Sequence, residues 1–438
     1  MTTPFKVLII GGGPVGLTAA HALHRANIPF TLLESRPSIV IDAGSNLVLL
    51  PTGLRILSQL GLLPTLNRHT SPLGAIHRFD HAGNPIGDAN FFLHYTRNHG
   101  IAPRVVSRHD LTNILYTSLP TSAQASLLPN KRVSSITTTS RDSVTVTCAD
   151  GSAHTGTILI GADGAHSIVR SQMRSLAQAS NATPEKINRE HPFLTTYRAL
   201  WIRFPTQGDL SPGDSNETHG KDCAIQTFVG EETAVIGMYE RLPQPTQQPQ
   251  RWSIKDEEAM ISRWGNLPVS KSVSVRQAYD TKLQAGVVSL EEGVVDNWSW
   301  DDKIVLVGDA AHKFTPSTGA GCNNGIVDVV VLVNEIVNAR AAGEGMEKAF
   351  GEYQRARFDE VVGGWKGAGQ ATATATWQDG VHRFVDLHVL RRKAVQKVFM
   401  DRAADGIART PVLGFVEDQG LEGGRVAWVK GGSALVVA

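Results

Sequence analysis

The sequence predicts an α/β protein with a Rossmann-like nucleotide-binding domain, an inserted antiparallel-sheet domain and a helical C-terminal region. An apolar run at 5–10 ends in glycines and precedes a segment of helical period. Between 195 and 241 the period changes to two, and buried-strand character returns at 303–307. The nucleotide-binding domain is therefore expected to be discontinuous. We expect it in 1–75, 100–180 and 285–345, the sheet domain in 76–99 and 181–284, and the helical region in 346–438.

The first part of the chain is expected to form a βαβ unit, with a helix over 15–26 and a second strand at 30–33. Further helices are expected at 52–60 and 108–118. The turn Asp150-Gly151 predicts a hairpin that returns the chain to the main sheet.

Two later helices carry recognisable signals. Ser253-x-x-Asp256 resembles a capping box that opens a helix to Trp264. The segment 381–402 predicts a basic amphipathic helix. We expect it to cap the nucleotide-binding domain, and weak peripheral contact with an anionic membrane is the alternative.

Composition excludes several classes of protein. The chain has 438 residues, and its 42 Lys/Arg against 41 Asp/Glu give a net charge of only +1, which argues against a nucleic-acid partner. The three cysteines have no C-x-x-C spacing, and no signal peptide or transmembrane segment is expected. We therefore expect a cytoplasmic location and no metal site.

The motif Gly11-x-Gly13-x-x-Gly16 follows the first strand and opens the first helix. Its glycines allow a tight turn, close approach to a pyrophosphate and close helix–strand packing. Glu34 ends the second strand, where a carboxylate can bind both hydroxyls of an adenosine ribose. The groove is expected to take FAD or NAD. Glu34 disfavours NADP there, although Arg36 keeps that alternative open.

Two more clusters follow predicted strands. The first is GADGAHSxxR at 161–170, which contains Asp163, and the second begins with GDAAH at 308–312, which contains Asp309. An aspartate at a strand end can hold sugar hydroxyls, and a glycine-rich helix entrance offers N–H donors to an anion. For each cluster an ordinary loop with a helix cap is the alternative.

In this order the three clusters resemble the group A flavoprotein monooxygenases, the superfamily of p-hydroxybenzoate hydroxylase, over most of residues 5–340. The segment HKFTPSTGAGCNNGIVD is similar to fungal FAD monooxygenases of indole-diterpene, alkaloid and meroterpenoid pathways. The resemblance implies an FAD-binding domain of the glutathione-reductase type. Cys322 departs from it, because a small or apolar residue is more familiar there.

The resemblance also implies roles for individual residues. Gly11, Gly13 and Gly16 would bind the FAD pyrophosphate, Glu34 the adenosine ribose, and Arg108 the phosphates or the adenosine. Asp163 belongs to the family's motif for FAD and NAD(P)H. Asp309 would hold the ribitol, and Pro316, Gly319 and Gly321 would lie at the edge of the isoalloxazine. Arg198 and Tyr239, in the strands of the sheet domain, are the candidate catalytic residues. Which face of the strand at 195–204 meets the flavin stays open. His312 is expected to support its loop.

The implied activity is that of an FAD-dependent monooxygenase that consumes NADPH or NADH and dioxygen. A C4a-hydroperoxide of the flavin would hydroxylate or epoxidise a hydrophobic small molecule, either aromatic or prenylated, of indole or terpenoid type. An FAD-dependent reductase or dehydrogenase without oxygen transfer is the first alternative. A flavin-bound protein without catalysis is the second.

Overall fold

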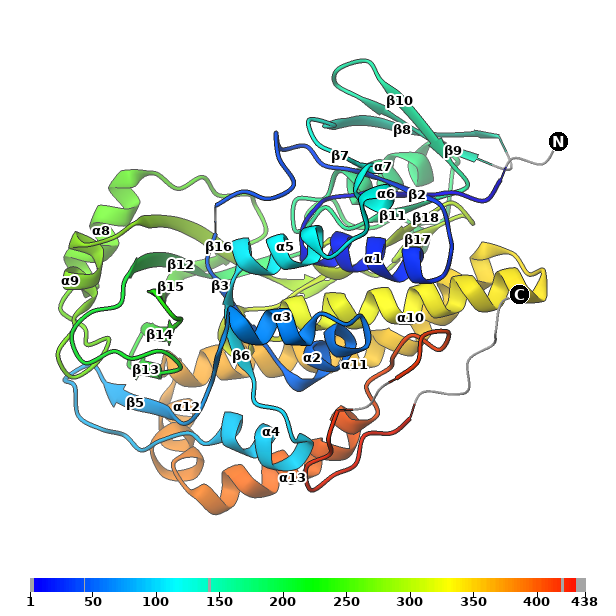
Figure 1. Ribbon diagram of the computed structural model, residues 1–438. Helices are drawn as coiled ribbons and strands as arrows, with labels where there is room; N and C mark the ends of the chain where they lie inside the picture. Colours follow the sequence, from blue (N-terminus) through cyan, green and yellow to red (C-terminus); the bar gives the residue numbers. More distant parts are fainter. Residues whose placement is uncertain (1–3, 43, 141–142, 419–420, 431–438) are drawn as a thin grey trace.

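The computed structural model describes residues 4–42, 44–140, 143–418 and 421–430 (Figure 1). Its first domain is built on a six-stranded sheet with β1 (Val7–Ile10) near the centre. β1 pairs in parallel with both β2 and β11, which places the ends of these strands at one edge. The strands follow the order β17 (Ser299–Trp300), β18 (Ile304–Leu306), β11 (Ile158–Gly161), β1, β2 (Phe30–Leu33) and β7 (Leu127–Leu128).

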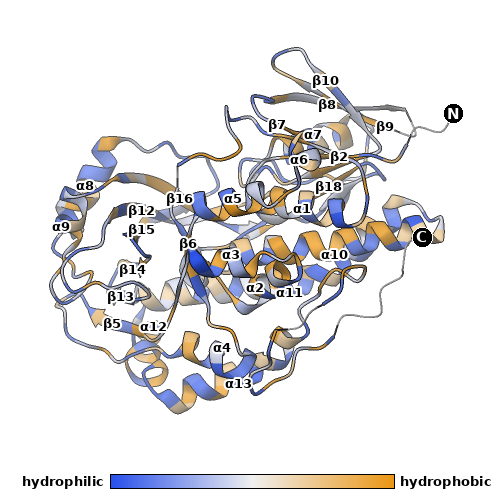
Figure 2. Ribbon diagram, in the orientation of Figure 1, coloured by the Kyte–Doolittle hydropathy of each residue, from blue (hydrophilic) through white to orange (hydrophobic). Residues whose placement is uncertain are grey.

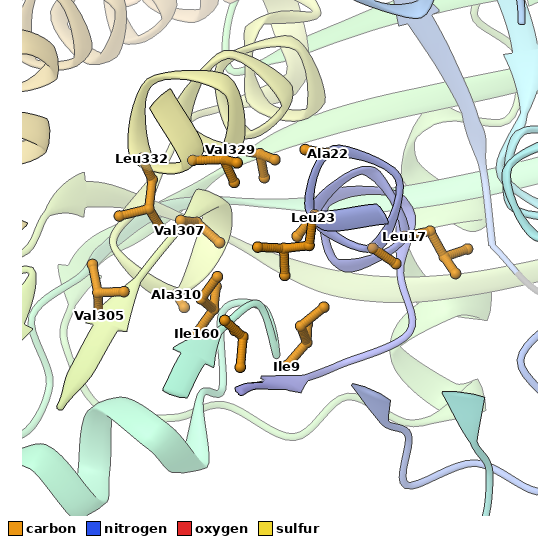
Figure 3. Close-up of a cluster of buried hydrophobic side chains, with 14 of the residues drawn as sticks. Ile9, Leu17, Ala22, Leu23, Ile160, Val305, Val307, Ala310, Val329 and Leu332 are labelled. Atoms are coloured by element: carbon orange, nitrogen blue, oxygen red, sulfur yellow. The ribbon is translucent and has the colours of Figure 1, made fainter. Parts of the chain in front are cut away.

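Two long apolar helices cover this sheet. α1 (Pro14–Arg25) follows β1, and α10 (Ala320–Ala342) packs against α1 and against α11 (Met346–Ala375). Leu17 and Leu332 lie with Ile9 of β1 in one buried cluster (Figure 3). α10 is largely hydrophobic along its length (Figure 2), as expected for a helix buried between other elements.

The second domain contains a seven-stranded sheet. Its order is β19 (His312–Lys313), β16 (Gln284–Val294), β12 (Leu194–Pro205), β15 (Thr233–Thr246), β14 (Cys223–Val229), β13 (Ser215–His219) and β5 (Ile76–Asp80). β16 pairs antiparallel with β12 from Gln284 to Glu292. This corrects the expected boundary, because the segment 285–294 lies in the sheet rather than in the nucleotide-binding domain.

The two faces of the seven-stranded sheet have different neighbours. Leu200, Ile202 and Phe204 of β12 pack with Met260 of α8 (Ile254–Trp264) and Val275 of α9 (Val275–Asp280). We call this the helix-covered face. Tyr197, Ala199 and Tyr239 point to the opposite side.

Smaller elements are formed by residues 46–179. Two three-stranded sheets consist of β3 (Asn46–Leu49), β6 (Arg104–Ser107) and β4 (Ser71–Pro72), and of β10 (Ala153–Gly156), β9 (Ser143–Cys148) and β8 (Val133–Ser140). The remaining helices of this part are α2 (Pro51–Gln59), α3 (Leu63–Arg68), α4 (Phe91–His99), α5 (Arg108–Thr117), α6 (Thr121–Gln124) and α7 (Ile168–Ala179). The architecture confirms the predicted α/β class with a helical C-terminal region.

The segment 381–402 is not the single amphipathic helix that its pattern predicted. It is divided into α12 (Gly380–Phe384), a π-helical segment at Val385–Leu390 and α13 (Lys393–Ala408). Asp386, in the π-helical segment, is fully buried and accepts hydrogen bonds from Arg78 and Trp377. These hydrogen bonds hold the Asp386 carboxylate inside the protein, which gives a physical reason for the π-helical segment between the two α-helices. Among the described residues, we find no helix with the length and hydrophobicity needed to cross a membrane.

Candidate functional site: a dinucleotide groove facing a mixed sheet

The turn between β1 and α1 requires glycine at two positions. Gly11 has a φ of +106°, and a Cβ atom there would lie 2.5 Å from the carbonyl oxygen of Ala162 on the neighbouring strand. A Cβ atom at Gly16 would overlap the carbonyl oxygen of Gly11. The turn is therefore tight, and α1 packs directly against the strands.

α1 presents an open N-terminus at this turn. Gly13 occupies the N-cap position, with Pro14 following, and no side chain caps the helix. The first N–H groups and the positive end of the helix dipole are thus available to an anion. The guanidinium of Arg108, at the start of α5, lies 3.6 Å from where a Cβ atom of Gly13 would be.

Glu34 lies next to the same turn at the end of β2. Its carboxylate accepts hydrogen bonds from the Gly12 amide at 2.7 Å and from the Arg36 amide and Nε at 2.8 and 2.9 Å. Burial raises the pKa of Glu34, but the hydrogen bonds from Arg36 and Gly12 outweigh burial and hold the pKa below its usual range. Glu34 is therefore an anion, and it also accepts from the Ser35 hydroxyl at 3.2 Å and from Arg36 Nη2 at 3.1 Å, so a ribose hydroxyl would replace one of these donors.

A cavity of about 420 Å³ extends over these residues. Four cationic side chains line it, which is more than the number of carboxylates and suits a diphosphate. Its polar and charged lining consists of Glu34, Ser35, Arg36, Arg108, Lys131, Arg132, Asp163 and His166, together with Gly11, Gly13 and Gly164. The cavity thus brings together Gly11, Gly13, Glu34, Arg108 and Asp163, which were predicted from separate segments.

Asp163 has a defined structural role in this cavity wall. Its carboxylate accepts hydrogen bonds from the Ser167 hydroxyl at 2.6 Å and the Val169 amide at 3.1 Å, at the start of α7. Arg170, in the same motif, donates to the carbonyl oxygens of Ala165 and Ala310 at 2.6 and 2.9 Å. The hydrogen bonds of Asp163 are therefore those of a helix cap, as in the alternative interpretation. Arg170 connects the GADGAHSxxR motif to the GDAAH motif through the Ala310 carbonyl.

Asp309 differs from the other carboxylates of the site. It is half-buried in the turn Gly308–Ala310, and it makes no hydrogen bond or ion pair with any residue that the structure describes. It lies beside α10, since its Oδ1 is 3.8 Å from where a Cβ atom of Gly321 would be. Its carboxylate is thus free to accept hydrogen bonds from a ligand.

The buried carboxylate of Asp328 holds the turn around Asp309 in place. Asp328 of α10 accepts hydrogen bonds from the Gly308 amide at 3.0 Å, from His312 Nε2 at 2.6 Å and from Arg357 Nε of α11 at 2.9 Å. Burial raises the pKa of Asp328, but His312 and Arg357 outweigh it and lower the pKa to about 2. His312 is fully buried in this arrangement, which matches the expected supporting role.

The next loop forms the entrance to α10. Pro316–Thr318 make a short 3-10 turn, and Gly319, with a φ of +65°, caps α10 without any side-chain cap. Asn323 holds this entrance in place, because it donates to the Val48 carbonyl at 2.8 Å and accepts from the Leu50 amide at 2.9 Å. Pro316, Gly319 and Gly321 thus lie at a second open helix N-terminus.

Tyr239 lies on the side of the seven-stranded sheet that meets this loop. Its hydroxyl donates to Gln226 Oε1 at 2.8 Å, and Gln226 Nε2 donates to the Ser317 carbonyl at 2.9 Å. We call this side the loop-facing side. Trp201 and Phe228 share it, because they follow the same alternation along β12 and β14.

Arg198 points the other way, toward the helix-covered face. Its Nε donates to Glu240 at 2.7 Å, and its guanidinium stacks 4.8 Å from the ring of Trp252. The face that the strand pattern left open is thus the one opposite Tyr197, away from the loop before α10.

Four more polar residues of the sheet domain were not singled out from the sequence. Arg203 pairs with both carboxylate oxygens of Asp42 at 2.7 and 2.9 Å and so ties the segment after β2 to the sheet. Glu217, His219 and Gln226 form hydrogen bonds with one another. Glu217 and His219 alternate along β13, which is the signal that could have found them, whereas Gln226 lies on the neighbouring strand β14.

Comparisons with known proteins identify relatives that are named for FAD. A sequence model of a protein family, described as "FAD binding domain", matches residues 4–362. The FAD-dependent monooxygenase spyC of Aspergillus fumigatus is 32% identical over 372 residues, which cover 82% of this chain and 77% of that protein. The FAD-dependent monooxygenase srdH of Neurospora crassa is 30% identical and covers 97% of this chain and 99% of its own length.

Solved structures share the fold. HpxO of Klebsiella pneumoniae, complexed with FAD and uric acid, has a TM-score of 0.72 at 21% identity, and the match covers 92% of this chain and 96% of that one. The p-nitrophenol 4-monooxygenase PnpA of Pseudomonas putida has a TM-score of 0.74 at 16% identity and covers 92% and 98%.

Proposed function

Because this chain belongs to the FAD-binding-domain family of FAD-dependent monooxygenases, we propose that it consumes NADPH or NADH and dioxygen to hydroxylate or epoxidise an aromatic or prenylated secondary metabolite. One observation carries the proposal. Two uncapped helix N-termini, those of α1 and α10, and two carboxylates, Glu34 and Asp309, come after parallel strands of the same six-stranded sheet.

The residues present fit FAD. Asp309 has a carboxylate without a partner among the described residues, and the cations of the groove suit a diphosphate. Gly11, Gly13 and Arg108, which line the cavity, would hold the pyrophosphate with Gly16, and Glu34 would hold the adenosine ribose. Outside the cavity lining, Asp309 would hold the ribitol, and Pro316, Gly319 and Gly321 would lie at the isoalloxazine edge. When bound, FAD supplies the redox chemistry, since it accepts a hydride from the nicotinamide and allows an oxygen atom to be taken from dioxygen.

The chain's own residues provide charge stabilisation and an apolar surface. The first N–H groups of α10, after Gly319, would stabilise negative charge near the flavin ring. Trp201 and Phe228 are half-buried on the loop-facing side and favour a hydrophobic substrate of indole or terpenoid type. Of the two predicted catalytic residues, Tyr239 lies on the loop-facing side with its hydroxyl donating to Gln226, and Arg198 lies on the opposite face.

Labelled dioxygen tests the proposal directly. The purified chain, loaded with FAD, is given NADPH or NADH and a panel of prenylated indoles and terpenoid phenols. We expect substrate-stimulated oxidation of the nicotinamide and transfer of the label into the product. Product without label would favour the reductase or dehydrogenase alternative. Nicotinamide oxidation that no panel member stimulates would contradict the substrate class proposed.

A further inference from the structure

A cluster of buried charged side chains lies between the seven-stranded sheet and the π-helical segment. It consists of Arg78 of β5, Glu217 and His219 of β13, and Asp386, and we call it the buried charge cluster. Arg78 Nη1 donates to Asp386 Oδ1 at 2.6 Å. His219 bridges Asp386 Oδ2 at 2.8 Å and Glu217 Oε2 at 3.0 Å. In Figure 1 these elements lie together at one end of the sheet, beside α12.

The charges of this cluster balance when His219 is protonated. Burial lowers the pKa of His219, but the carboxylates of Asp386 and Glu217 outweigh burial and raise the pKa to about 9. Burial raises the pKa of Glu217, whereas His219 and the hydrogen bond from Gln226 hold it below its usual range. At neutral pH two cations therefore face two anions, and Glu217 is a hydrogen-bond acceptor only. The other titratable groups that face the cluster are His81 and Tyr239.

This polarity fixes the orientation of the Gln226 amide. Gln226 Nε2 lies 2.7 Å from Glu217 Oε1 and 2.9 Å from the Ser317 carbonyl oxygen. Both of these oxygens can only accept hydrogen bonds, so the amide nitrogen must point to them. The amide oxygen is then directed to the Tyr239 hydroxyl, 2.8 Å away. Each hydrogen-bonding group of the Gln226 amide has a partner, and one of them is the loop before Gly319.

We propose that Gln226 is a positioning residue that holds the Pro316–Gly319 loop at a fixed place against the seven-stranded sheet, with its amide oriented by Glu217. Ser317 is the point of attachment, because its carbonyl binds Gln226 and its hydroxyl lies 2.6 Å from that of Thr372 on α11. The inference rests on the proposed function, since the loop leads into the helix N-terminus that would meet the flavin ring. Gln226 would thus set the distance between the flavin and the substrate-facing strands.

The variant Gln226→Glu gives a test that depends on pH. When protonated, the new side chain accepts from Tyr239 and has one hydrogen to donate in place of the two of the amide, so Glu217 and the Ser317 carbonyl share that donor and the loop keeps part of its attachment. When ionised, it faces the carboxylate of Glu217 and cannot donate to Ser317. We therefore expect FAD affinity about tenfold weaker at pH 8.5 than at pH 5.5. The visible circular dichroism of bound FAD should change over the same interval.

Two further variants complete the design. Thr227→Val is the matched control, because Thr227 is the next residue of β14, points to the other face and has a buried hydroxyl without a partner among the described residues. It should behave like the wild-type chain at both pH values. Gln226→Asn keeps the amide but shortens it, so it should alter the flavin signal at every pH without adding a charge.

These readouts need only FAD, so they do not depend on whether oxygen is transferred. A wild-type chain that takes up no FAD would overturn the proposed function and this inference together. FAD uptake by the wild-type chain, with flavin signals in Gln226→Glu and Gln226→Asn that match it at both pH values, would overturn this inference alone. The same pH response in Thr227→Val would also overturn it, because the effect would then not come from the loop-facing side.

Discussion

Substitution of Asp309 by alanine isolates one ligand contact. Its carboxylate makes no hydrogen bond or ion pair with any described residue, so Asp309→Ala breaks no such bond within the described part of the chain. Hydrogen bonds to a charged group contribute about 1.5–3 kcal/mol. Their loss should weaken FAD binding about 10- to 150-fold. The free energy of unfolding without FAD should change by less than about 0.5 kcal/mol, as for other substitutions away from the core.

Fluorescence titration of FAD into the deflavinated chain measures this dissociation constant, and thermal unfolding of the same samples measures stability. Asp359→Ala is a suitable control, because Asp359 of α11 is an exposed carboxylate that also lacks a hydrogen bond or ion pair among the described residues. It should leave FAD affinity unchanged. An Asp309→Ala chain that binds FAD as tightly as wild type would refute the ribitol assignment, and a large loss of stability would refute the claim that Asp309 has no partner.

Three other substitutions test neighbouring assignments. Glu34→Ala should weaken FAD binding by about 1.5–3 kcal/mol in the same titration, because it removes an anionic acceptor, and an unchanged affinity would contradict its role. Arg198→Leu should leave product formed per nicotinamide consumed near the wild-type value, since Arg198 pairs with Glu240 away from the loop; diversion to hydrogen peroxide would show otherwise. The pKa of Asp328 is depressed to about 2, so its stabilisation is present above the unfolded value near 4 and is lost as pH falls toward 2. Asp328→Asn should therefore lower the unfolding free energy at pH 7 by on the order of 2 kcal/mol and flatten its acid dependence, and a wild-type acid profile in the variant would contradict this account.

The cofactor groove could be predicted because its signals are local. Gly11, Gly16 and Glu34 lie within one βαβ unit, and the pairing of β1 with β2 brings them together whatever the rest of the chain does. Asp309 follows the same rule, since it comes directly after a buried strand that joins the same sheet. In each case the position of a residue relative to its strand end determines where its side chain lies.

The side of the substrate sheet could not be predicted in this way. A period of two in the strand at 194–205 separates Tyr197 from Arg198, but it does not say which face is covered by helices. That choice is made by α8, whose Met260 packs on the side of Leu200. Long-range contacts also determine where the helices of the C-terminal region begin and end. Asp386 pairs with Arg78, which is 308 residues away, and the hydrophobic pattern of 381–402 does not predict this pairing.

The ion pair between Arg357 and Asp328 limits how far the chain can be shortened. A flavin-binding fragment that ended near residue 345 would lack α11 and with it Arg357, whose Nε lies 2.9 Å from the fully buried Asp328 carboxylate. Removal of one partner from a buried ion pair costs about 3–5 kcal/mol. Asp328 also holds the Gly308 amide, so the turn that carries Asp309 would lose its support. A fragment intended to retain FAD should therefore extend past Arg357, and the family match to residue 362 agrees with that limit.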